Sequence, residues 1–173
     1  IVCPPGKDIR PTSSKIRQAI FNILYSMDFD MRQALVLELF SGTGIVSIEA
    51  ISRGAKKAVI VDNSHKANLF AEKNIHNLGM EDKINIIKQD AMEYVKNADI
   101  SDVNLIFIDP PYRYEKYSEL IESIFLKISN DAIVMAESDK IILNEDNEIG
   151  ARIIKIKNWG KTFITFMKKK RTN

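Results

Sequence analysis

The stretch LIFIDPPYRYEKY, residues 105–117, places an acid, two prolines and a tyrosine directly after an apolar run. Asp109 offers carboxylate oxygens and Pro110 a carbonyl, so together they could accept hydrogen bonds from the exocyclic amine of a base. Pro110 and Pro111 fix two backbone φ angles, which would hold these acceptors rigidly. Tyr112 offers a ring on which an unstacked base could lie. The ordinary alternative is a turn that ends a strand, because Asp-Pro and Pro-Pro are common in loops.

Three earlier strand ends could hold an adenosine-containing ligand. In ELFSGTG, Gly42 and Gly44 allow a tight turn and a close approach of a ligand to the backbone. Asp62, 18 residues beyond Gly44, suits a ribose hydroxyl pair, and Asp90 could accept from an adenine amine. Each has an ordinary alternative: glycines soften a strand-to-helix turn, and Asp62, Ser64 or Asp90 could cap the helix that follows.

Alternating strand and helix patterns would position these residues. Strands are expected at 34–39, 57–62, 83–88, 104–109 and 132–137, and helices at 14–27, 44–53, 64–78, 91–97 and 117–128. Thr12 or Ser13 could cap the first helix. The alternation predicts an α/β fold with a doubly wound, mostly parallel sheet, and 151–158 with 162–169 predict a terminal antiparallel hairpin. Such sheets bind ligands beyond the C-terminal ends of their strands.

The composition fits one globular domain. The chain has 173 residues, 45% of them hydrophobic, which is enough for a sizeable core. Its apolar runs are far shorter than the ~20 residues that span a membrane. The net charge of +2 is the difference between 25 basic and 23 acidic residues, so composition alone does not indicate a nucleic-acid partner. The terminal MKKKRTN is a compact basic cluster, which fits either a phosphate contact or a solubilising tail.

Few residues are available for disulfide or metal chemistry. Cys3 is the single cysteine, which excludes an internal disulfide and fits a reducing, cytoplasmic location. His65 and His76 stand in no metal-like cluster, so no metal site is expected. There is no signal-peptide pattern. The chain opens on Ile1 rather than Met, which suggests that a native N-terminal piece is absent.

Four motifs in one order carry a family resemblance. ELFSGTG, VDNS, QDAM and DPPY are similar to the central motifs of class I S-adenosylmethionine-dependent methyltransferases, and DPPY resembles the signature of the branch that methylates exocyclic amines of bases. The segment RPTSSKIRQAIFNIL, residues 10–24, resembles the N-terminal motif of the RsmD family, the bacterial 16S ribosomal RNA guanine-N2 methyltransferases. With the terminal hairpin, the resemblance covers essentially the whole chain.

The resemblance implies a role for each matched residue. It implies a single Rossmann-like methyltransferase domain over 1–173, with the N-terminal motif and helix in 1–30, the cofactor-binding and catalytic core in 34–137 and the hairpin in 151–168. The implied catalytic residues are Asp109, Pro110, Pro111 and Tyr112. The implied cofactor-binding residues are Glu38 at the methionine amino group, Phe40, Ser41, Gly42, Thr43 and Gly44 around the methionine part, Asp62 and Asn63 at the ribose, Asp90 and Ala91 at the adenine, and Thr12. The expected RNA contacts are Arg10, Arg17, Arg113, Lys161, Lys168, Lys169, Lys170 and Arg171, each of which could equally be capping or solvated surface.

The expected reaction is methyl transfer from S-adenosylmethionine to N2 of a guanine in 16S ribosomal RNA, by a monomer acting on an assembling small ribosomal subunit. N6-adenine methylation of DNA or RNA stays open, because the acceptors at Asp109 and Pro110 would serve either amine. A non-catalytic module that binds an adenosine ligand or RNA is a third alternative, which the intact acid, prolines and tyrosine disfavour. A nicotinamide oxidoreductase is disfavoured because Ser47 stands where the dinucleotide fingerprint has its third glycine.

Overall fold

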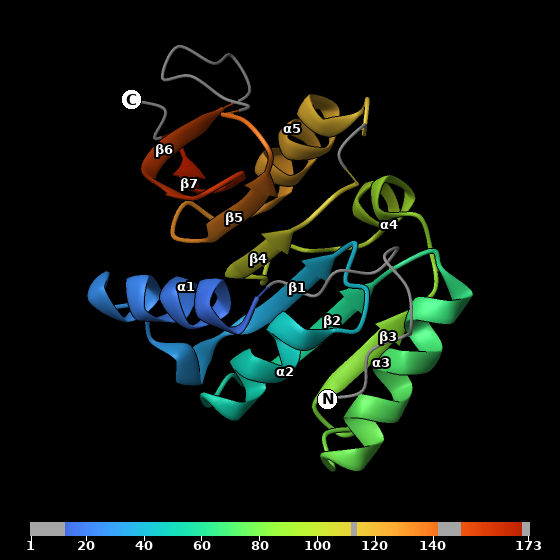
Figure 1. Cartoon of the computed structure of the whole chain (residues 1–173). Helices are drawn as coiled ribbons and strands as arrows, with labels where there is room; N and C mark the ends of the chain where they lie inside the picture. The colour runs from blue at the N-terminus through green and yellow to red at the C-terminus, as the bar shows by residue number, and fades with distance from the viewer. Residues whose placement is uncertain (1–12, 112–113, 142–149, 171–173) are drawn as a thin grey trace.

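One seven-stranded sheet organises the protein, in the order β3-β2-β1-β4-β5-β7-β6 (Figure 1). The computed structural model describes residues 13–111, 114–141 and 150–170. The strands are β1 (Leu35–Leu39), β2 (Lys57–Val61), β3 (Ile84–Ile87), β4 (Leu105–Ile108), β5 (Ile133–Ser138), β6 (Ala151–Trp159) and β7 (Thr162–Lys169). The helices are α1 (Ser14–Ser26), the 3-10 helix η1 (Met31–Gln33), α2 (Ile45–Ser52), α3 (His65–Asn77), α4 (Ala91–Asn97) and α5 (Tyr117–Lys127). The doubly wound α/β sheet with a C-terminal antiparallel hairpin, predicted from the sequence, is confirmed.

Local sequence sets the ends of these elements. The expected strands and helices match the observed ones to within one residue at either end, and η1 is an addition that the periodicity did not predict. Of the two candidates for capping α1, Ser13 accepts a hydrogen bond from Ile16 N at 3.3 Å. Ser64 caps α3 in the same way through Ala67 N at 3.2 Å, which leaves the Asp62 carboxylate available for other contacts.

The parallel strands end at one level. Leu39 at the end of β1 is in register with Val61 of β2 and with Ile108 of β4, and Val61 is in register with Ile87 of β3. The residues that directly follow β1, β2 and β4 therefore meet at one edge of the sheet. Strand β5 continues this alignment, because Ile108 pairs with Ala136, and β7 then pairs with β5 in the antiparallel direction.

Two helical layers bury the two faces of the sheet. One hydrophobic cluster joins α1, α2 and α3 to strand residues such as Val36 and Phe107, and the other joins α4 and α5 to Leu37 and Ile106. Successive residues alternate between the clusters because side chains alternate across a strand. Figure 1 shows α1 and α2 in front of the strands. Among the described helices, none combines the length and apolarity needed to cross a membrane.

The turn after β1 requires glycine at position 44 for two reasons, its backbone conformation and the lack of space for a side chain. Gly44 has φ +70°, a left-handed conformation that costs an L residue roughly 1–2 kcal/mol. A Cβ at this position would also lie 2.9 Å from Cδ1 of Ile60, which is fully buried on β2. Gly79, with φ +62°, has nothing within 4 Å of the same hypothetical Cβ.

We therefore expect Gly44→Ala to lower the free energy of unfolding by roughly 2–4 kcal/mol, because strain and a core clash add together. Gly79→Ala is the matched control, since it meets similar strain in open space and should cost about 1 kcal/mol. Urea denaturation of both variants would measure the difference. Equal losses in the two variants would show that the close approach to Ile60 does not constrain the turn.

Candidate active site

Glu38, the second-to-last residue of β1, has a buried carboxylate close to the sheet edge at which the parallel strands end. Its side chain is 2% exposed, and its Oε2 accepts a hydrogen bond from the backbone N–H of Ser47 at 2.8 Å. Burial raises the pKa of Glu38 from its ordinary value of 4.5 to about 7, with hydrogen bonds from Ser47 and Val46 opposing the shift and the nearby Asp62 charge adding to it. A cationic group placed beside Glu38 would restore the charged form.

The turn between β1 and α2 has an unusual backbone. Phe40, Gly42 and Gly44 all have positive φ, at 58°, 54° and 70°. Ser41 N donates to Val61 O at 3.2 Å and Gly44 N donates to Ser41 O at 2.8 Å, which ties the turn to β2 and closes it on itself. The hydroxyls of Ser41 and Thr43 are buried and have no hydrogen-bond partner in the structure. Unpaired buried hydroxyls are costly, so this turn is suited to a polar ligand.

Asp62 connects the glycine turn to the start of α3. Its Oδ2 accepts from Gly42 N and its Oδ1 accepts from Ser64 N, each at 2.8 Å. Asn68 Nδ2 donates to the carbonyls of Asp62 at 2.9 Å and Ser64 at 3.0 Å, which fixes the loop from the helix side. A carboxylate has about four acceptor sites, so Asp62 keeps capacity for a ribose hydroxyl pair. Sequence patterns did not single out Asn68; its burial, together with Ala67 and Ala71 of the same helix, is visible only in the fold.

After β3, Asp90 has the helix-capping role that was the ordinary alternative to binding adenine. Asp90 caps α4, because its Oδ1 accepts from Glu93 N at 3.1 Å. Ala91 is buried and Asn63, on the neighbouring loop, is exposed. Capping uses one oxygen and does not prevent Asp90 from accepting an adenine amine, so the cofactor role expected for Asp90, Ala91 and Asn63 remains a prediction.

Asp109 stands at the C-terminal end of β4 with its backbone fixed by the sheet. Asp109 N donates to Leu39 O at 3.4 Å, one step beyond the last β1–β4 pair. Burial raises the pKa of Asp109 well above its ordinary value, and the charges of Glu137 and Glu38 add to the rise. Pro110 is half-buried and Pro111 exposed. The strand end therefore presents an acid that gains a proton more readily than an ordinary aspartate.

An aromatic contact joins the β4 loop to the glycine turn. The rings of Phe40 and Tyr114 meet edge to face, with centroids 4.9 Å apart and planes at 70°. Tyr114 N donates to Pro111 O at 2.9 Å, while the Tyr114 hydroxyl is buried without a partner and its pKa is raised by burial and by Asp90 and Glu119. Tyr114 belongs to the motif stretch, but no residue pattern distinguishes it from a surface tyrosine.

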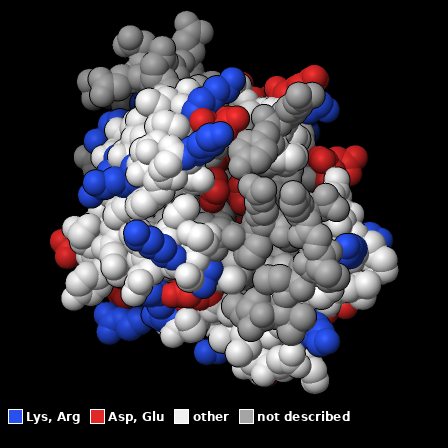
Figure 2. All heavy atoms as spheres, in the orientation of Figure 1, with Lys and Arg blue, Asp and Glu red and all other residues white. Residues whose placement is uncertain are grey.

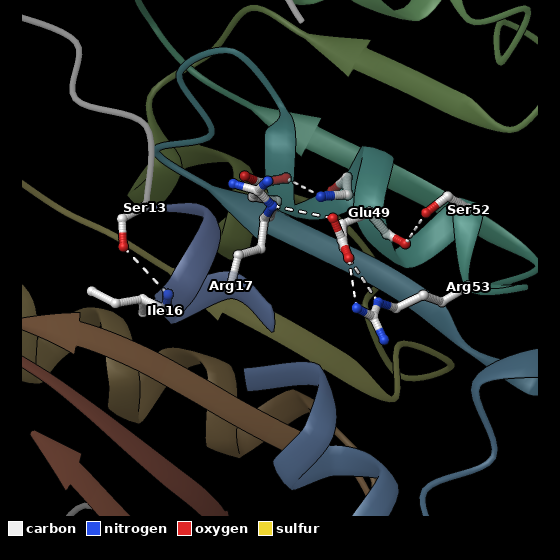
Figure 3. Close-up of polar contacts among 8 residues, drawn as sticks. Ser13, Ile16, Arg17, Glu49, Ser52 and Arg53 are labelled. Atoms are coloured by element: carbon white, nitrogen blue, oxygen red, sulfur yellow. Dashed lines mark hydrogen bonds and ion pairs between the residues drawn. The ribbon is translucent and has the colours of Figure 1, made fainter. Parts of the chain in front are cut away.

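Arg17, expected to contact RNA, forms an ion pair inside the protein. Figure 3 shows Arg17 reaching from α1 to Glu49 on α2, with Arg53 on the other side of the same carboxylate. Arg17 Nε lies 3.2 Å from Glu49 Oε2, and Arg53 Nη2 lies 2.7 Å from Glu49 Oε1. Arg53 also stacks over the Phe21 ring at 4.9 Å. These contacts dock α1 onto α2, and an additional RNA contact by Arg17 remains a prediction.

The remaining basic candidates lie on the terminal hairpin. Lys161 is exposed between β6 and β7, Lys168 is half-buried, and Lys169 Nζ donates to Ile128 O at 3.3 Å. Lys170 is exposed, and its N donates to Gly150 O at 2.7 Å. Figure 2 shows acidic atoms near the middle of the viewed face, with lysines and arginines in separate groups around it. The other candidates, Arg10, Thr12, Tyr112, Arg113 and Arg171, lie outside the described residues.

The candidate site combines the ends of β1, β2 and β4. The structure brings together Glu38, the glycine turn, Asp62 and Asp109 at one sheet edge, with Asp90 near Tyr114 beside them. Within the described part of the chain, no group of three or more His, Cys, Asp or Glu side chains could hold a metal ion. The arrangement suits an organic ligand that spans the glycine turn and offers a cation to Glu38 and hydroxyls to Asp62.

The sheet order, with its C-terminal antiparallel hairpin, is that of the methyltransferase fold. A family model described as Conserved hypothetical protein 95 matches residues 1–168, and the chain belongs to that family. The chain is 30% identical, over 96% of its length and 78% of the relative, to the ribosomal RNA small subunit methyltransferase D of Buchnera aphidicola. It is 28% identical, over 95% of its length and 90% of the relative, to the YlbH protein of Bacillus subtilis, whose name proposes an rRNA methyltransferase.

Solved structures show the same fold. A conserved hypothetical protein of Streptococcus pyogenes has a TM-score of 0.77 and 30% identity, covering 89% of this chain and 95% of that one. An RNA methyltransferase from Salinibacter ruber, in complex with S-adenosyl-L-homocysteine, has a TM-score of 0.71 and 18% identity, covering 95% and 96%. At that identity the second match supports the fold alone.

The raised pKa of Glu38 makes stability depend on pH. Because the folded-state pKa, about 7, lies above the ordinary 4.5, the unfolded chain releases this proton first, and stability falls as pH rises between the two values. From about pH 5 to about pH 8, the wild type should lose roughly 2–3 kcal/mol more than Glu38→Gln, which cannot ionise. Urea unfolding at both pH values would measure this, with Glu72→Gln, exposed on α3, as the control. Parallel pH profiles for wild type and Glu38→Gln would contradict the buried-acid assignment.

Proposed function

We propose that this protein transfers a methyl group from S-adenosylmethionine to the exocyclic N2 amine of a guanine in 16S ribosomal RNA. The observation that carries the proposal is the alignment of Asp109 and Pro110, at the end of β4, with the buried Glu38 and the glycine turn at the end of β1. The similarity to the ribosomal RNA small subunit methyltransferase D of Buchnera aphidicola supports the choice of RNA.

The residues present fit S-adenosylmethionine. Its α-ammonium group would lie at Glu38, where a cation relieves the cost of a buried carboxylate, and its ribose hydroxyls would lie at Asp62. The orphaned hydroxyls of Ser41 and Thr43 would gain partners in the methionine part. When bound, the cofactor supplies an activated methyl group on a sulfonium.

The protein's own chemistry would act on the amine. The lone pair of an exocyclic guanine amine is delocalised into the ring, so hydrogen bonds from its two N–H groups to Asp109 and to the Pro110 carbonyl favour the pyramidal, nucleophilic form. The same acceptors favour the positive charge that develops on nitrogen during transfer. Because the pKa of Asp109 is raised, its carboxylate is also a better acceptor for the proton that the product amine must lose.

The substrate would be presented by an assembling small ribosomal subunit in the cytoplasm, with the protein acting as a monomer. The hairpin lysines, Lys161 with Lys168 to Lys170, would contribute phosphate contacts at the β6–β7 end of the sheet. Arg10, Arg113 and Arg171 are proposed to add to these contacts, Thr12 to lie beside the cofactor and Tyr112 to stack on the target base.

Two measurements test this function. Isothermal titration should give tight binding of S-adenosylhomocysteine and none of NAD; the reverse result would identify a nicotinamide enzyme. Mapping of methylated nucleotides in ribosomal RNA from cells lacking this protein should show loss of one N2-methylguanosine in 16S RNA. Loss of an N6-methyladenosine instead would support the adenine alternative, because Asp109 and Pro110 would serve either amine.

Asp109→Ala should lower kcat by roughly 100- to 1000-fold, because one hydrogen-bond acceptor for the target amine is lost. Binding of S-adenosylhomocysteine should change little, since Glu38 and Asp62 remain. Asp102→Ala is the matched control, because Asp102 is exposed just before β4, at the opposite end of the same strand. Single-turnover methylation and titration calorimetry would separate the two effects. Wild-type rates in Asp109→Ala would refute the role of the carboxylate.

A further inference from the structure

A third acid, Glu137, lies on the same sheet face as Glu38 and Asp109. On β4 and β5, Phe107 and Met135 belong to the cluster beneath α1, α2 and α3. Side chains alternate along a strand, so Asp109 and Glu137, two residues further on, point to that same side. The order β1-β4-β5 therefore places the three acids on successive strands of one face.

The strand register makes Asp109 and Glu137 direct neighbours. The last matched pair between β4 and β5 is Ile108 with Ala136, so the next pair along is Asp109 with Glu137. Adjacent strands lie roughly 5 Å apart, which brings the two carboxyl groups within reach of one planar ligand. The two carboxyl groups are close enough to interact electrostatically, because the Glu137 charge contributes to the raised pKa of Asp109.

A carboxylate has about four acceptor sites, so two acids side by side at this sheet edge could accept hydrogen bonds from a planar ligand rich in N–H donors, whatever other contacts they make. The proposed methyl transfer uses Asp109 and Pro110 for the two N–H groups of the amine and leaves Glu137 unassigned. Guanine carries a third donor, N1–H, directly beside that amine. Adenine carries a lone pair at its N1, which a carboxylate would repel.

We infer that Glu137 accepts a hydrogen bond from N1–H of the target guanine and thereby selects guanine over bases that lack this donor. The inference rests on the proposed function and deepens it, because Asp109 and Pro110 alone do not distinguish guanine from adenine. Glu137 is a specificity residue on the neighbouring strand, and recognition is completed along the Watson–Crick edge of a base taken out of its stack.

The probe is 2-aminopurine, which keeps the exocyclic N2 amine of guanine but has a lone pair at N1. Small-subunit particles would be reconstituted with 16S RNA carrying either guanine or 2-aminopurine at the target position, which the mapping experiment identifies. The wild-type protein should prefer guanine by roughly 10- to 100-fold in kcat/KM, because the 2-aminopurine N1 faces a carboxylate.

Glu137→Gln should bring this ratio close to one, because an amide can donate to N1 of 2-aminopurine as well as accept from N1–H of guanine. Glu137→Asp, which keeps the carboxylate, should retain the preference at a reduced rate. Asp139→Asn is the control, since it removes the same charge from an exposed position two residues away and should leave the ratio unchanged.

The outcomes separate the two proposals. No transfer to guanine particles by the wild-type protein would refute the proposed function itself. Transfer to guanine with an undiminished preference in Glu137→Gln would refute only the role of Glu137. A purely structural role for Glu137 would lower both rates in parallel and leave the ratio at its wild-type value, which would equally overturn the inference. Thermal unfolding and S-adenosylhomocysteine affinity of each variant would verify folding. If Glu137→Gln is unstable, Glu137→Ala carries the comparison, because loss of the carboxylate should also reduce the preference for guanine.

Discussion

The parallel register of the central strands is the constraint on which the site depends. Leu39, Val61 and Ile108 end their strands at the same level, so the residues that follow them are neighbours although they are far apart in the chain. Hydrogen bonds then continue across the ends, from Ser41 N to Val61 O and from Asp109 N to Leu39 O. The loops that bear the candidate chemistry thus inherit the rigidity of the sheet, which is what the positioning of a small ligand requires.

Repulsion between acids is the electrostatic consequence of that alignment. Glu38 and Asp109 both have raised pKa values, mainly from burial, and each is raised further by another acid of the same edge. Such an arrangement lowers the stability of the empty protein, and natural proteins retain such costs mostly where function needs them. Two arginines of the same sheet face, Arg17 and Arg53, form ion pairs with Glu49 between α1 and α2 (Figure 3). A cationic ligand and a donor-rich base would compensate the repulsion between the acids of the edge.

The sequence predicted the sheet, the helices and the strand ends because these depend on local periodicity and on short motifs. It could not choose between Ser13 and Thr12 as a cap, since either residue type fits, nor could it predict the positive φ of Phe40, which the surrounding turn imposes. The ion pair of Arg17 with Glu49 spans 32 residues and depends on how α1 docks on α2. The sequence suggested an RNA contact for Arg17 because it lies in the N-terminal motif. The packing of α1 on α2 shows that it also pairs with Glu49.

The proposed recognition of guanine would have a similar origin in tertiary structure. The Asp-Pro-Pro segment is suited to accept hydrogen bonds from an exocyclic amine, and its acceptors do not distinguish the amine of guanine from that of adenine. Selection among bases needs a group that touches the next atom along the base edge, and in the proposed arrangement that atom would lie over the neighbouring strand. Glu137 becomes visible as a candidate only once β5 is known to pair with β4 in this register, since in sequence it is one more acid near a strand end. Specificity of this kind is therefore a property of strand order, while the capacity for amine chemistry is a property of the motif.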